Sequence, residues 1–238
     1  MRFPFAASSY VWTPPSPGDP SQVPSLRSEG SSRGVMVNLN ANRRMVFTND
    51  DELSVAVILL ARRDVVALCD QPPAVRYVDT HGVQRDYTCG YLATMVDGET
   101  IAIAVKPVQI AQRDTFIETL ELIARQIPRA FADSVTLMTE LDCPAWLVAN
   151  SVSILSVNRQ RERDDVTDNT VLAIVANIQG AVLIGDIVEM SGLAGRAFRS
   201  IIRLISKGAL VAMLGKRFDY DVYVSKNAAF FAGTGALL

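Results

Sequence analysis

The sequence predicts a mixed α/β protein of the α+β class, built from two units that follow one another along the chain. Between residues 35 and 160, short runs rich in β-branched residues alternate with longer amphipathic segments, which is typical of a sheet flanked by helices. Between residues 161 and 227, three apolar-periodic segments separated by glycine precede two short strand-like runs. A segment of high charge density, residues 159 to 169, lies at the junction and is interpreted as a linker.

The two ends of the chain differ in composition from the units between them. Residues 1 to 34 are rich in serine, proline and glycine, and such a stretch buries too little apolar surface to offset the entropy lost on ordering. We therefore predict a disordered tail, acting either as a spacer (or preceding a true start at Met36) or as a docking segment. The aromatic residues available for docking are Phe3, Phe5, Tyr10 and Trp12. Residues 228 to 238 are expected to form a C-terminal tail.

The first unit is expected to open with two strands and a helix. The strands are VMVNLN and RRMVFT, and the helix is DELSVAVILLARRD, where apolar residues recur at helical spacing. Thr48, Asn49 and Asp50 immediately precede or open this helix, and all three residue types are good N-caps. Residues 65 to 107 then predict three or four strands, with hairpin turns at DTHG and DG.

The rest of the first unit is predicted to contain two more helices and one strand. RDTFIETLELIARQIPRAFA is amphipathic and predicts a helix, and SVTLMTE predicts a strand. PAWLVANSVSILSVNRQ predicts a further helix that begins on proline, a favoured first-turn residue. The expected order is therefore helix, strands, helix, strand, helix.

Composition and charge exclude several classes of protein. The chain has 238 residues, of which 49% are hydrophobic and 20% charged, so it can bury a sizeable core. Its net charge is −2, and nucleic-acid contact would have to come from a local basic face. The three cysteines, Cys69, Cys89 and Cys143, form no CxxC pair, which disfavours a disulfide framework or zinc site and fits a cytoplasmic location. No apolar run reaches the roughly 18 residues of a membrane span, so no membrane partner is expected.

Several motifs of the first unit, in their order and spacing, resemble those of the TnsA-type transposon endonucleases. These motifs are DDELSVAVILLARRDVVALCDQPPAVRY, DYTCGYLATMVDG, IAIAVKP and LMTELDCPAWLVANSVSILSVNR, and the resemblance covers roughly residues 33 to 225. It implies a PD-(D/E)xK fold, a restriction-endonuclease-like mixed sheet flanked by helices, over residues 35 to 160. It also implies a C-terminal winged helix-turn-helix and a transposase-like or recombinase-like partner.

The resemblance carries four positions of the family's metal site onto this chain. Glu52 stands for the helix carboxylate, Gly90 for the strand aspartate, Ala104 for the acid or amide, and Lys106 for the lysine. Phosphodiester hydrolysis in this family needs Mg²⁺ or Mn²⁺, hard cations that bind oxygen ligands. Glycine and alanine offer no side-chain oxygen, so the four positions are expected to be vestigial, with no metal or other cofactor bound.

The neighbours of these positions supply no replacement ligand. Asp86 lies about 13 Å from Gly90 along an extended strand, which is too far to take over the lost coordination. Lys106 has the alternative interpretations of merely ending a strand or pairing with Glu52. Nothing in the sequence lowers the pKa of Cys89, so we expect its side chain to pack in the core.

The second unit has the element order of a winged helix-turn-helix, three helices followed by a two-stranded ribbon. The predicted helices are NTVLAIVANIQG, LIGDIVEMSG and GRAFRSIIRLISKG, and the predicted strands of the ribbon are ALVAML and DYDVYVS. The segment GKRF, between the two strands, is expected to form the tip of the ribbon. Residues 161 to 227 are therefore expected to form a DNA-binding domain.

Six basic residues and no acid occur between Ser191 and Arg217, and they are the candidate DNA-binding residues: Arg196, Arg199, Arg203, Lys207, Lys216 and Arg217. The three arginines recur at helical spacing, and we predict that they share one exposed helix face. Arginine on such a face binds phosphate or guanine edges in double-stranded DNA. The alternative is a solvated basic face on a unit that binds protein.

Three functional hypotheses follow. The first is a non-catalytic DNA-binding protein that uses the nuclease fold as a scaffold or partner platform in a mobile-element, phage-related or transcription-regulating assembly. The second is an active, metal-dependent endonuclease subunit of TnsA type, for which Mg²⁺ would be the cofactor. The third is a protein–protein adaptor that does not bind DNA.

Overall fold

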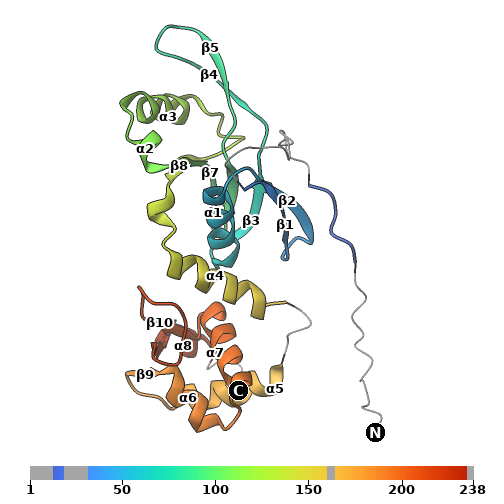
Figure 1. Cartoon of the computed structure of the whole chain (residues 1–238), viewed down its shortest axis with the longest axis vertical. Coiled ribbons are helices and arrows are strands. Elements are labelled where there is room, and N and C mark those ends of the chain that lie inside the picture. Colours follow the sequence, from blue (N-terminus) through green and yellow to red (C-terminus); the bar gives the residue numbers. More distant parts are fainter. Residues whose placement is uncertain (1–12, 19–31, 160–163, 235–238) are drawn as a thin grey trace.

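The computed structural model describes residues 13–18, 32–159 and 164–234. Its first unit contains β1 (Gly34–Asn38), β2 (Arg43–Phe47), α1 (Asp50–Ala61), β3 (Val65–Asp70), β4 (Val75–Val78), β5 (Gln84–Tyr87), β6 (Tyr91–Met95), β7 (Thr100–Val105), α2 (Val108–Ala111), α3 (Asp114–Gln126), β8 (Ser134–Met138), the 3-10 turn η1 (Glu140–Asp142) and α4 (Ala145–Val157). Its second unit contains α5 (Asp165–Ala176), β9 (Ala181–Leu183), α6 (Ile184–Ser191), α7 (Gly195–Lys207), β10 (Leu210–Ala212), β11 (Tyr223–Lys226) and α8 (Ala228–Thr234). The chain is mixed α/β, as the sequence predicts (Figure 1).

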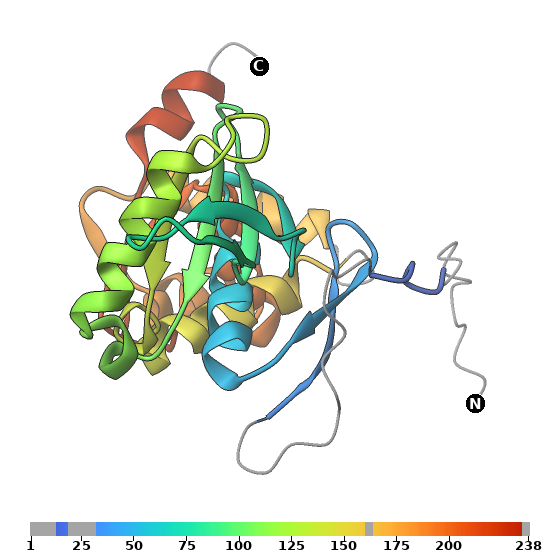
Figure 2. The same cartoon turned by 90° about the horizontal axis from the view of Figure 1, so that it is seen from above.

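A four-stranded mixed sheet organises the first unit. Its strand order is β3-β6-β7-β8, with β3 and β7 both antiparallel to β6, and β8 parallel to β7. A parallel neighbour requires a crossover connection, and α3 lies within it. Successive side chains of β7 point to opposite faces of the sheet. Ile103 packs in the core beneath α1, and Ala102 packs in a second core that includes Phe131, from the segment that follows α3. Figure 2 shows α1 and α3 on opposite sides of the sheet.

The stretch from residue 65 to residue 107 forms five strands, where the sequence predicts three or four. Gln84–Tyr87 does not continue into the central sheet but pairs with Val75–Val78, and this β4–β5 hairpin projects from one end of the molecule (Figure 1). The two hairpins meet at Gly90, whose amide donates to the Ile103 carbonyl at 3.0 Å. The turns at 79–82 and 96–99 lie where DTHG and DG predict them.

Both predicted tails contain residues that take part in the fold. Residue Ser16 forms a bridge with Arg43 of β2, and its amide donates to the Asn42 carbonyl at 2.9 Å. Gly34, the last residue of the predicted tail, begins β1. The prediction of disorder for positions 1–12 and 19–31 lies outside the described residues. At the other end, Ala228–Thr234 forms α8, where the sequence predicts a tail.

The second unit packs three helices against a small sheet. Its core includes side chains of each helix, among them Val171 of α5, Ile187 of α6 and Ile201 of α7. The sheet has the order β10-β11-β9, so the last strand in the chain lies in the middle. Gly192 and Gly208 end α6 and α7 in the left-handed region, with φ of 65° and 79°, where glycine carries no Cβ penalty.

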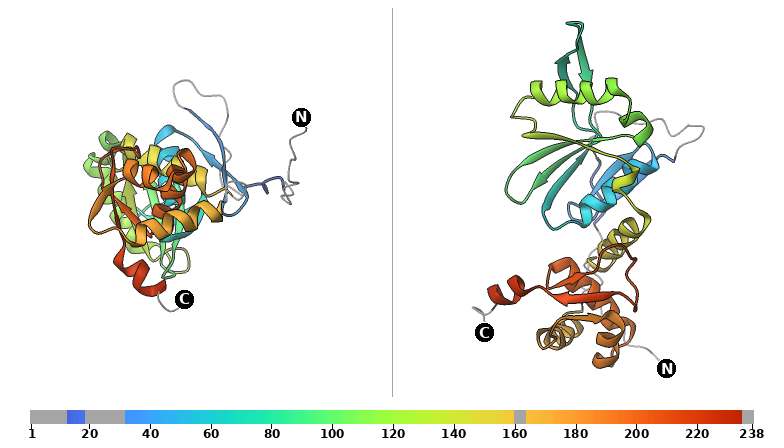
Figure 3. Two further views of the ribbon diagram at one scale, coloured as in Figure 1. Left: turned by 90° about the horizontal axis from the view of Figure 1, so that it is seen from below. Right: turned by 90° about the vertical axis from the view of Figure 1, so that its left-hand side faces the viewer.

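Helix α4 connects the two units. It packs against α1 on one side and contacts α7 on the other, and it lies between the sheet and the C-terminal helices in two perpendicular views (Figures 1 and 3). Helix α4 also forms hydrogen bonds to the second unit at two places. Asn150, in its middle, donates to the Lys216 carbonyl, and Asn158, at its end, donates to the Ser206 hydroxyl. Within the described residues, no helix is both long enough and apolar enough to cross a bilayer.

Candidate functional site

The carboxylate of Glu52 is fully engaged at the start of α1. Glu52 is 7% exposed, and its Oε2 accepts hydrogen bonds from the amide and the hydroxyl of Thr48 at 2.7 and 2.9 Å. The Gln71 side-chain amide lies 3.4 Å from Oε1, on the other side. Asn49 caps the helix by accepting from the Glu52 amide. The carboxylate thus fixes the entry of the chain into α1 and does not pair with Lys106.

The other three carried-over positions cannot complete a metal site with Glu52. A Cβ placed on Gly90 would lie 3.2 Å from Cγ2 of Val105, so the space beside Gly90 is already occupied by a core side chain. Ala104 is fully buried and pairs with Leu137 of β8. Lys106 follows β7, is partly exposed, and donates its amide to the Met138 carbonyl.

The residues present do not fit a divalent cation. Among residues 13–18, 32–159 and 164–234, no three His, Cys, Asp or Glu side chains come close enough to hold a metal ion. Glu52 is the one carboxylate among the four positions, and its oxygens already accept three hydrogen bonds. A hard cation such as Mg²⁺ takes several oxygen ligands at short distance. At the four positions, the side-chain oxygens are those of Glu52, and they could bind a cation only if their hydrogen bonds at the start of α1 were broken.

A second buried carboxylate, missed by sequence analysis, lies at the end of β3. Asp70 is fully buried, and its Oδ2 accepts from the Val46 amide at 2.7 Å. Its Oδ1 lies 3.7 Å from the Arg43 guanidinium and has no hydrogen-bond partner within the described residues. Asp70 and Glu52 therefore hold alternate amides of the chain that leaves β2, those of Val46 and Thr48. A carboxylate that ends an apolar strand, as in VVALCD, is the sequence signal for this role.

Cys89, beside Gly90, packs in the core as predicted. It is 4% exposed, and burial raises the pKa of its thiol to about 11. Because the thiolate is the reactive form, we expect iodoacetamide to leave Cys89 unmodified in the native protein near neutral pH. Peptide mass spectrometry measures this, with the same reaction in denaturant as the control. Equal modification of Cys89 in both conditions would contradict the expectation.

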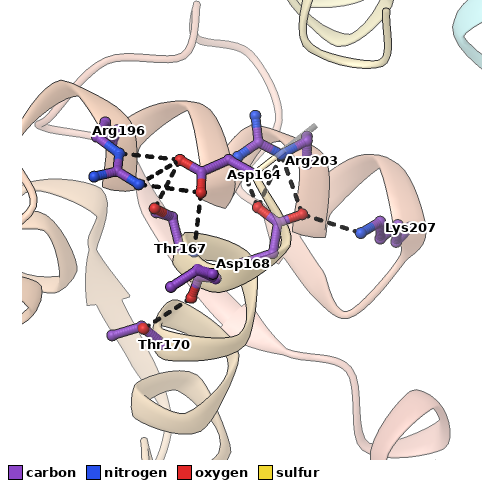
Figure 4. Close-up of polar contacts among 8 residues, drawn as sticks. Asp164, Thr167, Asp168, Thr170, Arg196, Arg203 and Lys207 are labelled. Atoms are coloured by element: carbon purple, nitrogen blue, oxygen red, sulfur yellow. Dashed lines mark hydrogen bonds and ion pairs between the residues drawn. The ribbon is translucent and has the colours of Figure 1, made fainter. Parts of the chain in front are cut away.

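The three arginines of α7 do not share one exposed face, and the prediction that they do is wrong because Arg203 is buried. The Arg203 side chain is 5% exposed and contacts Asp168 of α5 through Nε at 2.8 Å and Nη2 at 2.7 Å. Nζ of Lys207 lies 3.1 Å from the other oxygen of the same carboxylate (Figure 4). The physical reason is that α5 packs along this side of α7 and presents acids to it.

Arg196 is also paired, although it stays at the surface. The Arg196 side chain is 62% exposed and binds Asp164 through two hydrogen bonds of 3.0 and 3.1 Å. Asp164 caps α5 by accepting from Thr167, and this bond together with the Arg196 guanidinium holds the pKa of Asp164 below its usual range. Asp164 and Asp168 are four residues apart around the start of α5, which places both on the side that faces α7.

Two of the remaining three basic residues lie at the surface. Arg199 is partly buried, and Lys216 and Arg217 are exposed in the loop between β10 and β11. Nζ of Lys216 lies 3.1 Å from Asp221, in an exposed pair of the kind that contributes little to stability. Three of the six predicted residues, Arg196, Arg203 and Lys207, therefore pair with acids at the start of α5, and two, Lys216 and Arg217, are exposed on the loop.

The backbone of this loop is bound by α4. The side chain of Asn150, in the middle of α4, donates to the Lys216 carbonyl at 2.9 Å and accepts from the Phe218 amide at 2.7 Å. Asn150 is 5% exposed, so both polar ends of a buried amide are satisfied by one short stretch of chain. Its partners are backbone atoms far along the chain, and no sequence pattern predicts such a contact.

No protein-family model matches this chain, and no curated protein sequence matches it either. The candidate site is therefore defined by geometry. It consists of a hairpin region in which the four carried-over positions are apolar or structurally engaged, and of a helical unit with two exposed cations, Lys216 and Arg217, on the loop between β10 and β11.

Proposed function

We propose that this chain is a DNA-binding protein in which a winged helix contacts duplex DNA and a nuclease-type unit without metal chemistry acts as a scaffold or partner platform. The observation that carries the proposal is the arrangement of α5, β9, α6, α7, β10 and β11, with β11 between the other two strands. In this arrangement α6 and α7 take the places of a helix-turn-helix, α7 is the recognition helix, and residues 213–222 are the wing.

The distribution of charge favours the wing as the DNA contact. Lys216 and Arg217 are exposed on it, and cations that reach the phosphate backbone supply most of the non-specific affinity for DNA. The first unit carries the opposite charge where a nuclease site would lie. Asp51 opens α1 there, and burial and the nearby Glu140 raise the pKa of its carboxyl. An acidic surface of this kind repels phosphate.

The topology of the first unit supports a relation to TnsA-type nucleases. A helix, three antiparallel strands, a crossover helix and a parallel fourth strand follow in the order that this resemblance implies. With the metal positions lost, such a unit has the role of a platform. Candidate partners are a transposase-like or recombinase-like protein, or the transcription machinery.

Replacing both wing cations, Lys216→Ala with Arg217→Ala, is expected to weaken DNA binding by about five- to tenfold. Each phosphate contact contributes about 0.9 to the slope of log K against log salt concentration, so the slope should fall by about 2. Fluorescence anisotropy with a short linear duplex of mixed sequence, titrated at several salt concentrations, measures both quantities.

The control for the wing variant removes two exposed arginines of the first unit, Arg76→Ala with Arg125→Ala. Their side chains are 77% and 74% exposed, and they lie on β4 and α3. The control loses the same net charge and should bind DNA as the wild type does. Equal weakening of both variants would show that only net charge matters. Absence of DNA binding at low salt, both by the wild type and by Asn150→Ala, which releases the loop from α4, would refute the proposed function and favour the adaptor.

A further inference from the structure

Helix α4 covers the outward face of α7. Ala197, Ile201 and Leu204 of α7 point into the core of the C-terminal unit, and Ile202 and Ser206 lie on the opposite side of the helix. Oγ of Ser206 accepts from the Asn158 side chain at 2.7 Å, at the end of α4. The face of a recognition helix that would meet DNA is therefore in contact with the first unit.

Ile202 shows how closely the two helices pack. It lies one turn before Ser206 on the same face and is 3% exposed, although it is not part of the core cluster of the C-terminal unit. We attribute its burial to α4, the helix that contacts α7 on this side. An isoleucine on the outward face of α7 is thus removed from solvent only while the two units stay together.

The first unit also binds the wing and the C-terminal end of α7. Asn150 binds the wing backbone at Lys216 and Phe218, as described above. Arg63, just after α1, reaches the other end and donates to the Lys207 carbonyl at 3.5 Å. Its guanidinium occupies the space where a Cβ of residue 208 would lie, so the close approach depends on Gly208.

From these contacts we infer that α4 and DNA compete for the same face of the C-terminal unit, so that the structure is a closed state which must open before α7 enters a major groove. This inference rests on the proposed DNA-binding function. A major groove about 12 Å wide admits one helix, and it leaves no room for α4 beside the outward face of α7. The closed state holds the wing and α7 as one block with the first unit.

Competition of this kind lowers the apparent affinity for DNA. If only the open state binds along α7, the apparent affinity is the intrinsic affinity multiplied by the fraction of open molecules. Opening exposes Ile202 and breaks the bonds made by Asn150 and Asn158, so the closed state predominates in the free protein. Any change that weakens the closed state without touching the DNA-facing cations should therefore strengthen DNA binding.

The test removes the α4 contacts one at a time, with Asn150→Ala and Asn158→Ala. Because each substitution removes one or two hydrogen bonds of the closed state, we expect the dissociation constant for a short mixed-sequence duplex to fall, by about five- to tenfold for Asn150→Ala. Hydrogen–deuterium exchange at the Phe218 amide is the second readout. It should be slow in the wild type, fast in Asn150→Ala, and faster in the wild type once DNA is added.

Val152→Ala is the matched control, because Val152 is 50% exposed and lies on the far side of α4 from Asn150. It should leave DNA binding and exchange unchanged. Equal or weaker DNA binding in both asparagine variants, or slower Phe218 exchange on adding DNA, would overturn the inference and leave the proposed function standing. Failure of the wild type and of Asn150→Ala to bind duplex DNA at low salt would overturn both.

Discussion

Arg203→Ala is expected to destabilise the C-terminal unit by about 3–5 kcal/mol, because it removes the main partner of a buried carboxylate. The Asp168 side chain is 7% exposed, and Arg203 contributes its shortest contact, at 2.7 Å. Burial alone would raise the pKa of Asp168, but its bonds to Arg203 and Lys207 hold that pKa below the usual range. Without the guanidinium, Asp168 keeps only the half-exposed Lys207 ammonium as a cationic partner.

Urea unfolding followed by circular dichroism measures this loss, and Arg196→Ala is its control. Arg196 forms a similar two-pronged pair with Asp164, but its side chain is 62% exposed, and an exposed pair contributes about 1 kcal/mol or less. The two substitutions remove the same charge from the same helix and differ in burial. Similar losses for both would show that the Asp168 pair is not a buried structural contact.

The pH dependence of the same variant has a definite sign. A carboxyl whose pKa is depressed in the folded state contributes stability that is present above its unfolded pKa, near 4, and is lost as the pH falls through the folded value. The wild type therefore gains stability from Asp168 near neutral pH and loses that gain in acid. The difference in unfolding free energy between the wild type and Arg203→Ala should accordingly shrink as the pH is lowered through this range.

Because Arg203 is buried, its substitution is a poor test of DNA binding. Loss of DNA binding in Arg203→Ala would follow from a weakened fold, with or without a DNA contact at that position. The wing cations Lys216 and Arg217 are exposed and separable from the core, so they test DNA binding without this ambiguity.

Local sequence signals predict those elements that have a clear hydrophobic periodicity or a capping residue at one end. Helix α1 begins after an Asn49 cap and α7 ends on Gly208, as the sequence indicates. The three-residue β9 and the assignment of Gln84–Tyr87 to a separate hairpin were not predictable. Both depend on pairing with partners elsewhere in the chain, Ala181–Leu183 with β11 and Gln84–Tyr87 with β4, and a short run of residues carries no mark of its partner.

The residue types of the candidate site could be predicted from the sequence, but what their side chains face could not. Helical spacing correctly places Arg196 and Arg203 on one side of α7, but only the tertiary packing shows that this side faces α5. The acids that pair with them, Asp164 and Asp168, both lie within the charged segment interpreted as a linker, and their spacing of four residues is the sequence signal for this pairing. The role of Asn150 had no signal, because its partners are backbone atoms.

Ala104→Glu, which places an acid at one of the metal positions that the resemblance implies, is expected to destabilise the first unit by about 3 kcal/mol or more. Ala104 is fully buried in β7, in register with Leu137, so the new carboxyl would be removed from solvent. Burial should raise the pKa of that carboxyl, and the loss of stability should therefore grow as the pH rises through the usual carboxyl range. Thermal unfolding measured at several pH values, with Ala104→Gln as the uncharged control of similar size, separates the effect of charge from that of volume.

The same variant tests whether one added acid is enough to create a metal site at the four carried-over positions. The oxygens of Glu52 remain bound to Thr48 and Gln71, and an aspartate at Gly90 would start its side chain 3.2 Å from Val105. An acid at position 104 would thus have no second ligand group beside it. We therefore expect Mg²⁺ and Mn²⁺ to leave the melting temperature of Ala104→Glu unchanged. A rise with either ion that Ala104→Gln does not show would mean that the carboxylates converge after all, and the chain would then retain the framework of a metal-dependent nuclease.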